Sequence, residues 1–342
     1  MIKLGLVGLG FWSLRIAEQI KRSSKAKLYK VFSRTKSKRE SFARNFDCLT
    51  ANSYEELLND SFVDGIILET PNKVHKEQII MAAKYRKPVF VDKPICNSIK
   101  EALEAVAACR WAEVLLMVGH SSRKRPESRK MKNILREGRI GKPVAVNSTI
   151  ASPKGFDLTC KDWRWYKDRC PGGPLIQIGI HHADTLAYLM GPIDSVAGFQ
   201  SRLYIEADIA DTTTTILRFA SGCLGQINAY YNTVSTYEII VLGTEGKMTY
   251  SKFEGLWITD LNNKKKRITL PDKDPIDEAL LSEIEEFSNC IRTGEKPEVG
   301  EEEGIRALAV IEAAIKSQES GKVLNLGEII KGCQVKPDKS FW

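Results

Sequence analysis

The sequence predicts an α/β domain with a doubly wound parallel sheet, followed by an α+β domain with a largely antiparallel open sheet. Three observations predict this. The 342 residues correspond to about two domains of roughly 150 residues each. The first third of the chain alternates short apolar runs with helical stretches, and the rest has longer strands rich in Thr, Val and Tyr. We expect the domains to cover residues 1–120 and 121–330.

The first domain is expected to contain parallel strands separated by amphipathic helices. Parallel strands need crossover connections, which bury both faces of the sheet, so each strand appears as a continuous apolar run. The expected strands are residues 3–7, 28–32, 65–68, 88–91 and 114–118.

The second domain is expected to pair long alternating strands into an open sheet, with one face available for packing or for a partner subunit. Two later helices either close this domain or pack back onto the first. The expected strands are residues 144–150, 195–205, 212–219, 223–231, 237–242 and 247–250, and the expected helices are 127–136, 276–292 and 303–316.

Composition excludes several classes of protein. No apolar run reaches the roughly 18 residues of a membrane-spanning helix. The net charge of +8 comes from dispersed basic residues, so no nucleic-acid partner is expected. The eight cysteines form no C-x-x-C pair and no zinc spacing, which indicates reduced thiols and no metal site. Because the first residues already form a strand pattern without a leader, we expect a cytoplasmic protein.

A glycine-rich turn follows the first strand and opens a helix. Gly8 permits a tight turn, Gly10 lets a pyrophosphate approach the helix N-terminus, and Ser13 is a small residue in place of a third glycine. This context favours a Rossmann-type dinucleotide site, with Phe11 and Trp12 beside the cofactor. The alternative is a glycine-rich turn without a ligand.

The end of the second strand bears on the choice of cofactor. An acidic residue there would bind the ribose 2′-hydroxyl, but the sequence has Ser33 and Arg34, followed by Lys36 and Lys38. A guanidinium pairs well with a 2′-phosphate, so NADP is favoured over NAD. The alternative is a solvent-facing basic start of a helix.

Two further loops follow the next two strands, at the edge where open α/β sheets bind ligands. The first carries Thr70-Pro71-Asn72 and His75, and the second carries Asp92 and Lys93. Lys93 is expected to project toward the nicotinamide, where partial desolvation would lower its pKa enough for proton exchange near neutral pH. The alternative is a surface lysine before a turn proline.

The segment from Gly172-Gly173 to Asp184 carries a polar stripe. If it is helical, Gln177, His181 and Asp184 lie on one face at positions i, i+4 and i+7. For either His181 or His182, the alternative is a buried, hydrogen-bonded core histidine.

Over nearly its whole length the chain resembles the Gfo/Idh/MocA oxidoreductases, the family of glucose-fructose oxidoreductase and inositol 2-dehydrogenase. The resemblance rests on the ordered set of motifs: the glycine fingerprint, Thr70-Pro71 with His75, Asp92-Lys93-Pro94, Gly119-His120 with Arg123 and Pro126, Trp163-Arg164, the segment from Gly172 to Asp184, and Leu242-Gly243-Thr244-Glu245-Gly246. It implies a homodimer or homotetramer formed through the second domain. It also implies that Lys93 and His181 act at a hydroxyl of a pyranose, cyclitol or related polyol.

The sequence departs from the family pattern at two places. Gln177 stands where the family often has Asp, and an amide cannot carry charge or relay a proton. Asp92 replaces the usual Glu and keeps its charge. Glu69, just before Thr70, is an unusual charge at a strand end, and the sequence gives no account of it.

The resulting hypothesis is hydride transfer between a secondary alcohol carbon and the nicotinamide, with Lys93 and His181 as general acid/base groups. Two alternatives are a nucleotide-sensing regulator of the same fold and a redox-neutral enzyme with tightly held cofactor. The residues expected to bind the substrate, by orienting its hydroxyls, or to tune Lys93 and His181 are His120, Arg123, Trp163, Arg164, Gln177 and Asp184. An aromatic platform is expected from Phe156, Trp163, Trp165 and Tyr166, and an acidic substrate group is a further option for Arg123, Arg125, Arg129 and Lys130.

Overall fold

The computed structural model describes residues 1–333, which form two compact units. The first unit comprises Met1–Ser121 and Ile276–Ile305, and the second comprises Ser122–Pro275 and Arg306–Cys333. The first unit is therefore discontinuous in sequence. The sequence left open whether the helix expected at residues 276–292 closes the second domain or packs back onto the first. In the structure these residues belong to the first unit. The limits 1–120 and 121–330 stay a prediction.

The first unit is built on a six-stranded parallel sheet, which confirms the predicted doubly wound architecture. Its strand order is β3-β2-β1-β4-β5-β6. The two-residue strand β3 was not expected, because it is too short to leave an apolar run. The strands are β1 (Ile2–Val7), β2 (Ala26–Phe32), β3 (Leu49–Thr50), β4 (Gly65–Leu68), β5 (Val89–Asp92) and β6 (Leu116–Gly119).

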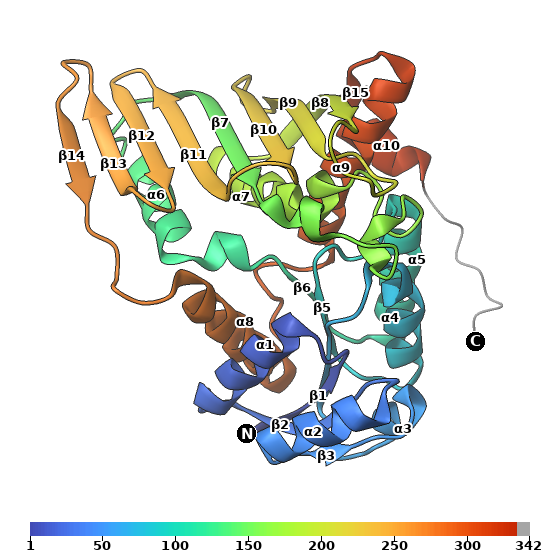
Figure 1. The fold of residues 1–342 in the computed structure, drawn as a ribbon. Coiled ribbons are helices and arrows are strands. Elements are labelled where there is room, and N and C mark those ends of the chain that lie inside the picture. Colours follow the sequence, from blue (N-terminus) through green and yellow to red (C-terminus); the bar gives the residue numbers. More distant parts are fainter. Residues whose placement is uncertain (334–342) are drawn as a thin grey trace. The chain divides into compact units, whose positions relative to one another are not determined.

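Helices cover both faces of this sheet. On one face, α1 (Phe11–Arg22), α2 (Lys36–Phe46) and α8 (Pro275–Thr293) share one buried apolar cluster with strands β1 and β2. Figure 1 shows α4 (His75–Lys84) and α5 (Ile99–Ala112) on the other side of the strands from α1 and α8. A short helix, α3 (Tyr54–Leu58), completes the unit. Burial on both faces explains why the strands are continuously apolar.

The second unit contains a nine-stranded sheet in the order β14-β13-β12-β11-β7-β10-β9-β8-β15. All its pairings are antiparallel except the one between β7 and β10, so the largely antiparallel prediction is confirmed. The strands are β7 (Pro143–Ala151), β8 (Ile193–Ser201), β9 (Thr212–Phe219), β10 (Leu224–Tyr230), β11 (Thr236–Gly243), β12 (Gly246–Ser251), β13 (Gly255–Asp260), β14 (Lys265–Ile268) and β15 (Leu324–Asn325).

Strand β8 ends at Ser201, whereas the sequence predicted a strand as far as residue 205. The reason is the carboxylate of Asp211, which accepts hydrogen bonds from the backbone N–H groups of Leu203, Tyr204 and Ile205 at 2.9, 2.7 and 3.1 Å. These three donors converge on one oxygen, so they cannot form a strand ladder. The outer strands β13 and β14 were not predicted.

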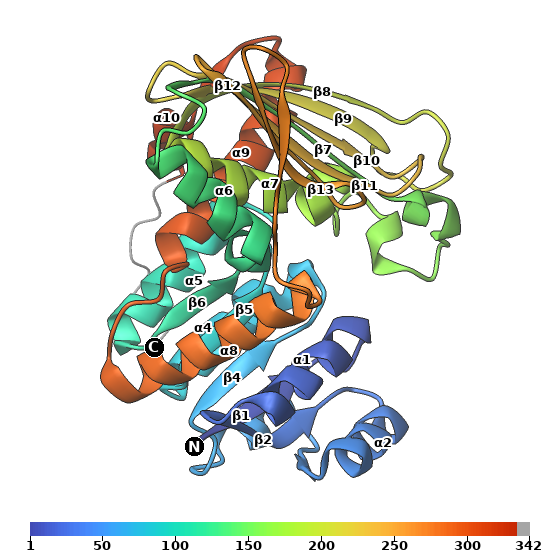
Figure 2. The same ribbon diagram turned by 90° about the vertical axis from the view of Figure 1, so that its left-hand side faces the viewer.

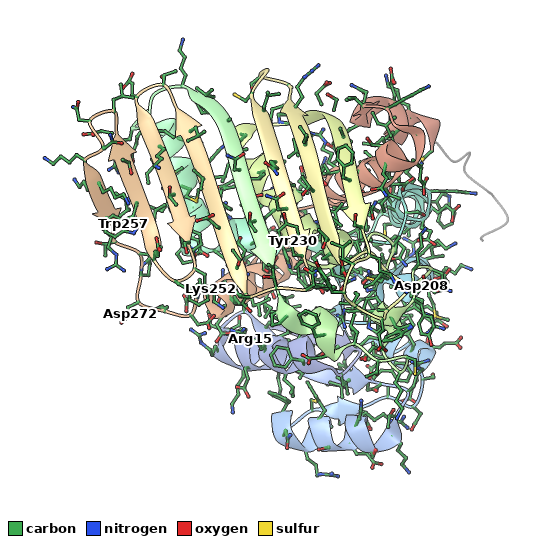
Figure 3. The ribbon with its side chains drawn as sticks, turned by 45° about the horizontal axis from the view of Figure 1, so that its top comes forward. Arg15, Asp208, Tyr230, Lys252, Trp257 and Asp272 are labelled. Atoms are coloured by element: carbon green, nitrogen blue, oxygen red, sulfur yellow. The ribbon has the colours of Figure 1, made fainter. Side chains whose placement is uncertain are left out.

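One face of this sheet is covered by helices and the other is open. Helices α6 (Pro126–Arg136), α7 (Ile180–Met190) and α9 (Glu301–Ser320) lie behind the strands in Figure 1, and α10 (Leu326–Gly332) follows β15. Figure 3 shows Tyr230 on β10 and Trp257 on β13. The open face also exposes large apolar side chains: Phe199 (67%), Ile216 (49%), Leu224 (53%) and Leu242 (37%).

Two further findings concern the class of protein. Among the residues described, none of the helices combines the length and apolar character that crossing a membrane requires. All eight cysteines lie in this part of the chain, and each is a free thiol.

Candidate active site

The glycine turn after β1 is closed by a serine. Gly8 has a φ of +86°, and a Cβ atom there would lie 2.4 Å from the carbonyl oxygen of Glu69, so the position requires glycine. The hydroxyl of Ser13 donates to the carbonyl of Gly8 at 2.5 Å and accepts from the N–H of Gly10 at 3.2 Å. Ser13 thus fixes the loop with its side chain while remaining small enough to be buried.

The start of α1 lies beside exposed aromatic rings. Phe11 is 67% exposed and Trp12 is 37% exposed, and their ring centroids are 5.7 Å apart in an edge-to-face arrangement. The guanidinium of Arg15, labelled in Figure 3, lies 5.7 Å from the Trp12 ring. The N-terminus of a helix carries a partial positive charge, so this end of α1 favours an anionic ligand group.

The end of β2 is held by an arginine that the sequence argument did not single out. Arg39 donates to the carbonyl of Ser33 at 3.2 Å and to the side-chain oxygen of Asn52 at 3.1 Å, and it is buried. Arg34, the residue predicted to meet a 2′-phosphate, is exposed. Arg39 therefore shapes the loop and Arg34 extends from it.

The loops after β4 and β5 are joined through His75. Its Nδ1 lies 2.9 Å from the carbonyl oxygen of Pro94, and its Nε2 lies 2.9 Å from that of Thr70. Burial lowers the pKa of His75, although the two carbonyl groups favour its charged form. The His75 side chain is 1% exposed and links the two loops from within the core.

Lys93 follows the last residue of β5 and is half-buried, as is Asp92. The Lys93–Pro94 peptide bond is cis. Glu69 follows the last residue of β4, the neighbouring strand, and is also half-buried. Burial raises the pKa of Glu69 well above its usual value; Asp92 raises it further, Lys93 lowers it, and Glu283 on α8 raises it. The unusual charge at the end of β4 is therefore electrostatically coupled to Lys93.

This edge of the sheet fits a dinucleotide. A Cβ atom built on Gly10 meets no atom within 4 Å, so the space above the turn is open. The amide nitrogen of Asn72 is buried and finds no hydrogen-bond partner within residues 1–333. An unsatisfied buried donor is costly, and a ligand acceptor would satisfy it. The open turn and this amide therefore leave room and a donor for such a ligand, and the individual cofactor contacts stay a prediction.

The Gly172-Gly173 turn also requires glycine. Both residues have positive φ, and a Cβ atom on Gly173 would lie 2.1 Å from the carbonyl oxygen of Ala210. Residues Leu175–Gly179 after it form a π-helix, and α7 begins only at Ile180. The expectation of one α-helical stripe is thus wrong for its first part, since a π-turn changes the angle between Gln177 and His181.

Gln177 is held by the segment that precedes the turn. The Nε of Arg164 donates to its side-chain oxygen at 3.0 Å, and the guanidinium carbon of Arg164 lies 4.4 Å from the centroid of the Trp163 ring. Gln177 is buried, whereas Arg164 and Trp163, in the short helix Trp163–Trp165, are half-buried. Three residues predicted to contact substrate thus form one connected group.

The two adjacent histidines have different environments. His182 is fully buried, packs edge-on against Tyr237 with centroids 4.6 Å apart, and has its pKa lowered to about 3 by burial and then by Arg125. His182 is therefore a neutral core residue. His181 is half-buried, and it is the member of the pair that remains a candidate for proton transfer.

Asp184 and Arg123 bind each other. Arg123 donates to both carboxylate oxygens of Asp184, from Nε at 2.8 Å and from Nη2, and both side chains are buried. This bidentate geometry is that of a structural ion pair. The sequence predicted that both residues orient substrate hydroxyls or tune Lys93 and His181, and in the structure each has the other as a partner.

The basic cluster around Arg123 is likewise engaged with protein groups. Arg129 donates to the hydroxyl of Tyr188 at 3.0 Å, and the guanidinium carbon of Arg125 lies 4.8 Å from the centroid of Tyr237. Lys132 donates to the carbonyl of Tyr188 at 2.6 Å, near the end of α7. These contacts favour a structural role over the binding of an acidic substrate group. Lys130 is half-buried.

The remaining candidates are distributed differently. His120, at the end of β6, is fully buried. Phe156 is 58% exposed, while Trp165 and Tyr166 are half-buried. The Tyr166 hydroxyl donates to the carbonyl of Cys160 at 2.9 Å, so this ring has a structural use. Within residues 1–333, no cluster of three or more His, Cys, Asp or Glu side chains has the arrangement of a metal site.

Known families match both parts of the chain. Residues 2–120 match the oxidoreductase family with an NAD-binding Rossmann fold, and residues 128–249 match the GFO/IDH/MocA C-terminal domain. The scyllo-inositol 2-dehydrogenase (NAD(+)) of Bacillus subtilis is 30% identical over 337 residues, 94% of this chain and 95% of the relative.

Two other comparisons agree. The 1,5-anhydro-D-fructose reductase of Ensifer adhaerens is 29% identical over 285 residues, 81% of this chain and 84% of the relative. A solved structure from Desulfitobacterium hafniense, assigned as an NADPH-dependent oxidoreductase, has a TM-score of 0.90 at 30% identity and covers 96% of this chain and 99% of that one.

The parallel sheet, its open glycine turn and the family matches define a nicotinamide-dinucleotide-dependent oxidoreductase. The chain belongs to the GFO/IDH/MocA family, as its motifs predicted.

Proposed function

We propose that this protein is a dehydrogenase or reductase acting on a CH–OH group, which interconverts a secondary hydroxyl and a ketone on a sugar, cyclitol or sugar derivative. The bound nicotinamide would accept or supply the hydride. The named relatives that act on inositol and on anhydrofructose support this substrate class.

The observation that carries the proposal is the position of Lys93. It follows β5 directly, on the edge of the parallel sheet where the open turn at Gly10 and the buried amide of Asn72 also lie. Ligands of open parallel sheets bind at this edge. Lys93, in the first unit, is therefore the group proposed to exchange the proton of the substrate hydroxyl.

In the second unit, His181 is proposed as the other acid/base group, because the buried neighbour His182 is excluded from that role by its neutral environment. Arg164 occupies the carbonyl oxygen of Gln177, which orients the amide. Gln177 and Arg164 then orient substrate hydroxyls, Trp163 supplies an apolar surface, and Arg123 with Asp184 positions the helix that carries His181.

NADP is proposed as the preferred cofactor. Arg34 is exposed at the end of β2, and Arg39 fixes the backbone from which it extends. A guanidinium in this place suits a 2′-phosphate, and no acidic side chain follows Ser33 to bind a free 2′-hydroxyl.

Assembly and location complete the proposal. The open face of the nine-stranded sheet exposes Phe199, Ile216 and Leu224, which a second copy would cover in a homodimer or homotetramer. Free thiols and a nicotinamide cofactor are consistent with the cytoplasm.

The experiment begins with separate fluorescence titrations of NADH and NADPH. Sugars, cyclitols and polyols are then screened at 340 nm with the preferred cofactor, beside a Lys93→Ala variant. Tight binding with turnover that is lost in Lys93→Ala supports the proposal. Wild-type turnover in that variant removes Lys93 from the mechanism.

The remaining outcomes separate the alternatives. Tight cofactor binding without release of reduced cofactor, but with conversion of substrate, identifies a redox-neutral enzyme. Binding with no conversion across the panel identifies a nucleotide sensor. Failure to bind either nucleotide contradicts the whole proposal.

A further inference from the structure

Glu69 lies on the neighbouring strand to Asp92, at the same level of the sheet. Leu68 on β4 pairs with Val91 on β5. The residues that follow them, Glu69 and Asp92, therefore lie next to each other in the same parallel register. The backbone N–H of Glu69 still donates to the carbonyl of Val7 at 2.8 Å. Glu69 is therefore fixed at the strand end beside Asp92, with Lys93 one residue further.

A third carboxyl group reaches this place from α8. The first turn of α8 is near the start of α1, because Arg15 donates from Nε to Asp277 at 3.0 Å. Ten residues later, Phe287 lies against Gly65, where β4 begins, and its ring centroid is 5.9 Å from that of Phe90. Helix α8 thus runs antiparallel to β4 (Figure 2).

This direction places Glu283 toward the carboxyl end of β4. Glu283 is one turn before Phe287, and helical side chains tilt toward the N-terminus of their helix. The Glu283 side chain, which is 1% exposed, therefore projects toward Glu69 and Asp92. One lysine and three carboxyl groups are thus brought together, with half-buried Lys93, Asp92 and Glu69 from the sheet and buried Glu283 from the helix.

We propose that Glu69 is a positioning residue for Lys93. Glu69 holds a proton at low pH and, on losing it, sets the pKa of the lysine ammonium. This inference rests on the proposed role of Lys93 as an acid/base group. Three adjacent carboxylates repel one another, so full ionisation of the group is costly and one proton is retained.

The direction of the effect follows from the charges. As pH rises, Glu69 ionises at a pKa well above its usual value, because burial and the neighbouring carboxylates oppose its charge. The new carboxylate stabilises the ammonium of Lys93 and raises its pKa. The lysine therefore loses its proton at higher pH than it would beside a neutral side chain. Glu69 delays the appearance of the free amine.

The test is a titration of Lys93 that needs no substrate. Lysines of the full chain are dimethylated with ¹³C-formaldehyde, and their NMR signals are followed against pH, with Lys93→Arg identifying the Lys93 signal. In Glu69→Gln, the midpoint for Lys93 is expected about one pH unit lower than in the wild type. Glu18→Gln, which changes an exposed carboxylate on α1, serves as the matched control and leaves the midpoint unchanged.

An unchanged Lys93 midpoint in folded Glu69→Gln overturns the inference. If that variant does not fold, Glu69→Ala gives the same test, with a downward shift expected and no shift contradicting it. Glu69→Asp, which keeps the charge, is expected to stay near the wild-type midpoint.

Activity gives a second and separable result. In Glu69→Gln, the limb of the pH profile of kcat/KM that reports Lys93 moves down by the same amount, which is about a tenfold change in free amine at a given pH on that limb. Absence of turnover in the wild type would contradict the proposed function, while the NMR shift would still decide the coupling of Glu69 to Lys93.

Discussion

The Nε of Arg164 donates a 3.0 Å hydrogen bond to the side-chain oxygen of Gln177. An amide carries no charge, so this contact is a hydrogen bond and not the ion pair that an aspartate would form with the same guanidinium.

Arg164→Lys tests this arrangement, because a lysine cannot reproduce the planar guanidinium that orients the amide. We expect KM for the substrate to rise about tenfold, since part of a hydrogen bond to a charged group of about 1.5–3 kcal/mol is lost. The dissociation constant of the cofactor should change less than about twofold. Steady-state kinetics measure both, with the exposed Arg202→Lys as control. An unchanged KM would show that Gln177 is oriented without Arg164.

Arg34→Ala tests the choice of cofactor. Loss of a charge-assisted contact to the 2′-phosphate should weaken NADPH binding about 10- to 100-fold and leave NADH binding nearly unchanged. Fluorescence titration with both nucleotides measures the ratio. Lys84→Ala, at the exposed end of α4, removes the same charge elsewhere in the unit. Equal losses for both nucleotides would assign Arg34 a general electrostatic role.

Asp184→Asn tests the buried ion pair with Arg123. Removing one partner leaves a buried guanidinium uncompensated, so the free energy of unfolding should fall by about 3–5 kcal/mol. Asp208→Asn breaks an exposed ion pair, in which Asp208 is 70% and Arg202 is 53% exposed. This variant should lose less than about 1 kcal/mol of the free energy of unfolding. Urea denaturation measures both variants. Similar small losses would mean that the buried pair adds little to stability.

His182→Phe tests the burial of a neutral histidine. The folded-state pKa of about 3 lies below the unfolded value of about 6.5, so the unfolded chain binds a proton first as pH falls. This contribution to stability is present above about pH 6.5 and is lost progressively toward pH 3, by about 1.4 kcal/mol per unit. Phenylalanine keeps an aromatic ring against Tyr237. The variant should lose stability less steeply between pH 6 and pH 4, whereas parallel curves would show that His182 is already charged.

The features that depend on neighbouring residues in the sequence were predictable. The buried strands left apolar runs, and Gly8, Gly10 and Ser13 marked the turn because their position between a strand and a helix restricts what can stand there. The end of β8 was not predictable. It depends on Asp211, whose carboxylate takes three backbone donors from a segment with the alternation of a strand.

The site could be predicted only as residue types. The sequence favoured His181 over His182 but left a buried core role open for either, and the packing of Tyr237 and Arg125 shows that His182 has that role. The π-helix at Leu175–Gly179 has no signature in the apolar period. Glu69 was noticed as an unusual charge, but its partner Glu283 is 214 residues away in sequence, so no spacing could connect them.

Helix α8 has a consequence for biosynthesis. The apolar cluster of the first unit needs Leu280, Ile284 and Phe287, yet these emerge from the ribosome only after all of residues 122–275. Domains that are continuous in sequence fold in the order in which they are made. Here the first unit cannot complete its core until residues 122–275 of the second have been translated, and until then one face of its sheet stays partly uncovered. A nascent chain that stalls before α8 would present this face to chaperones.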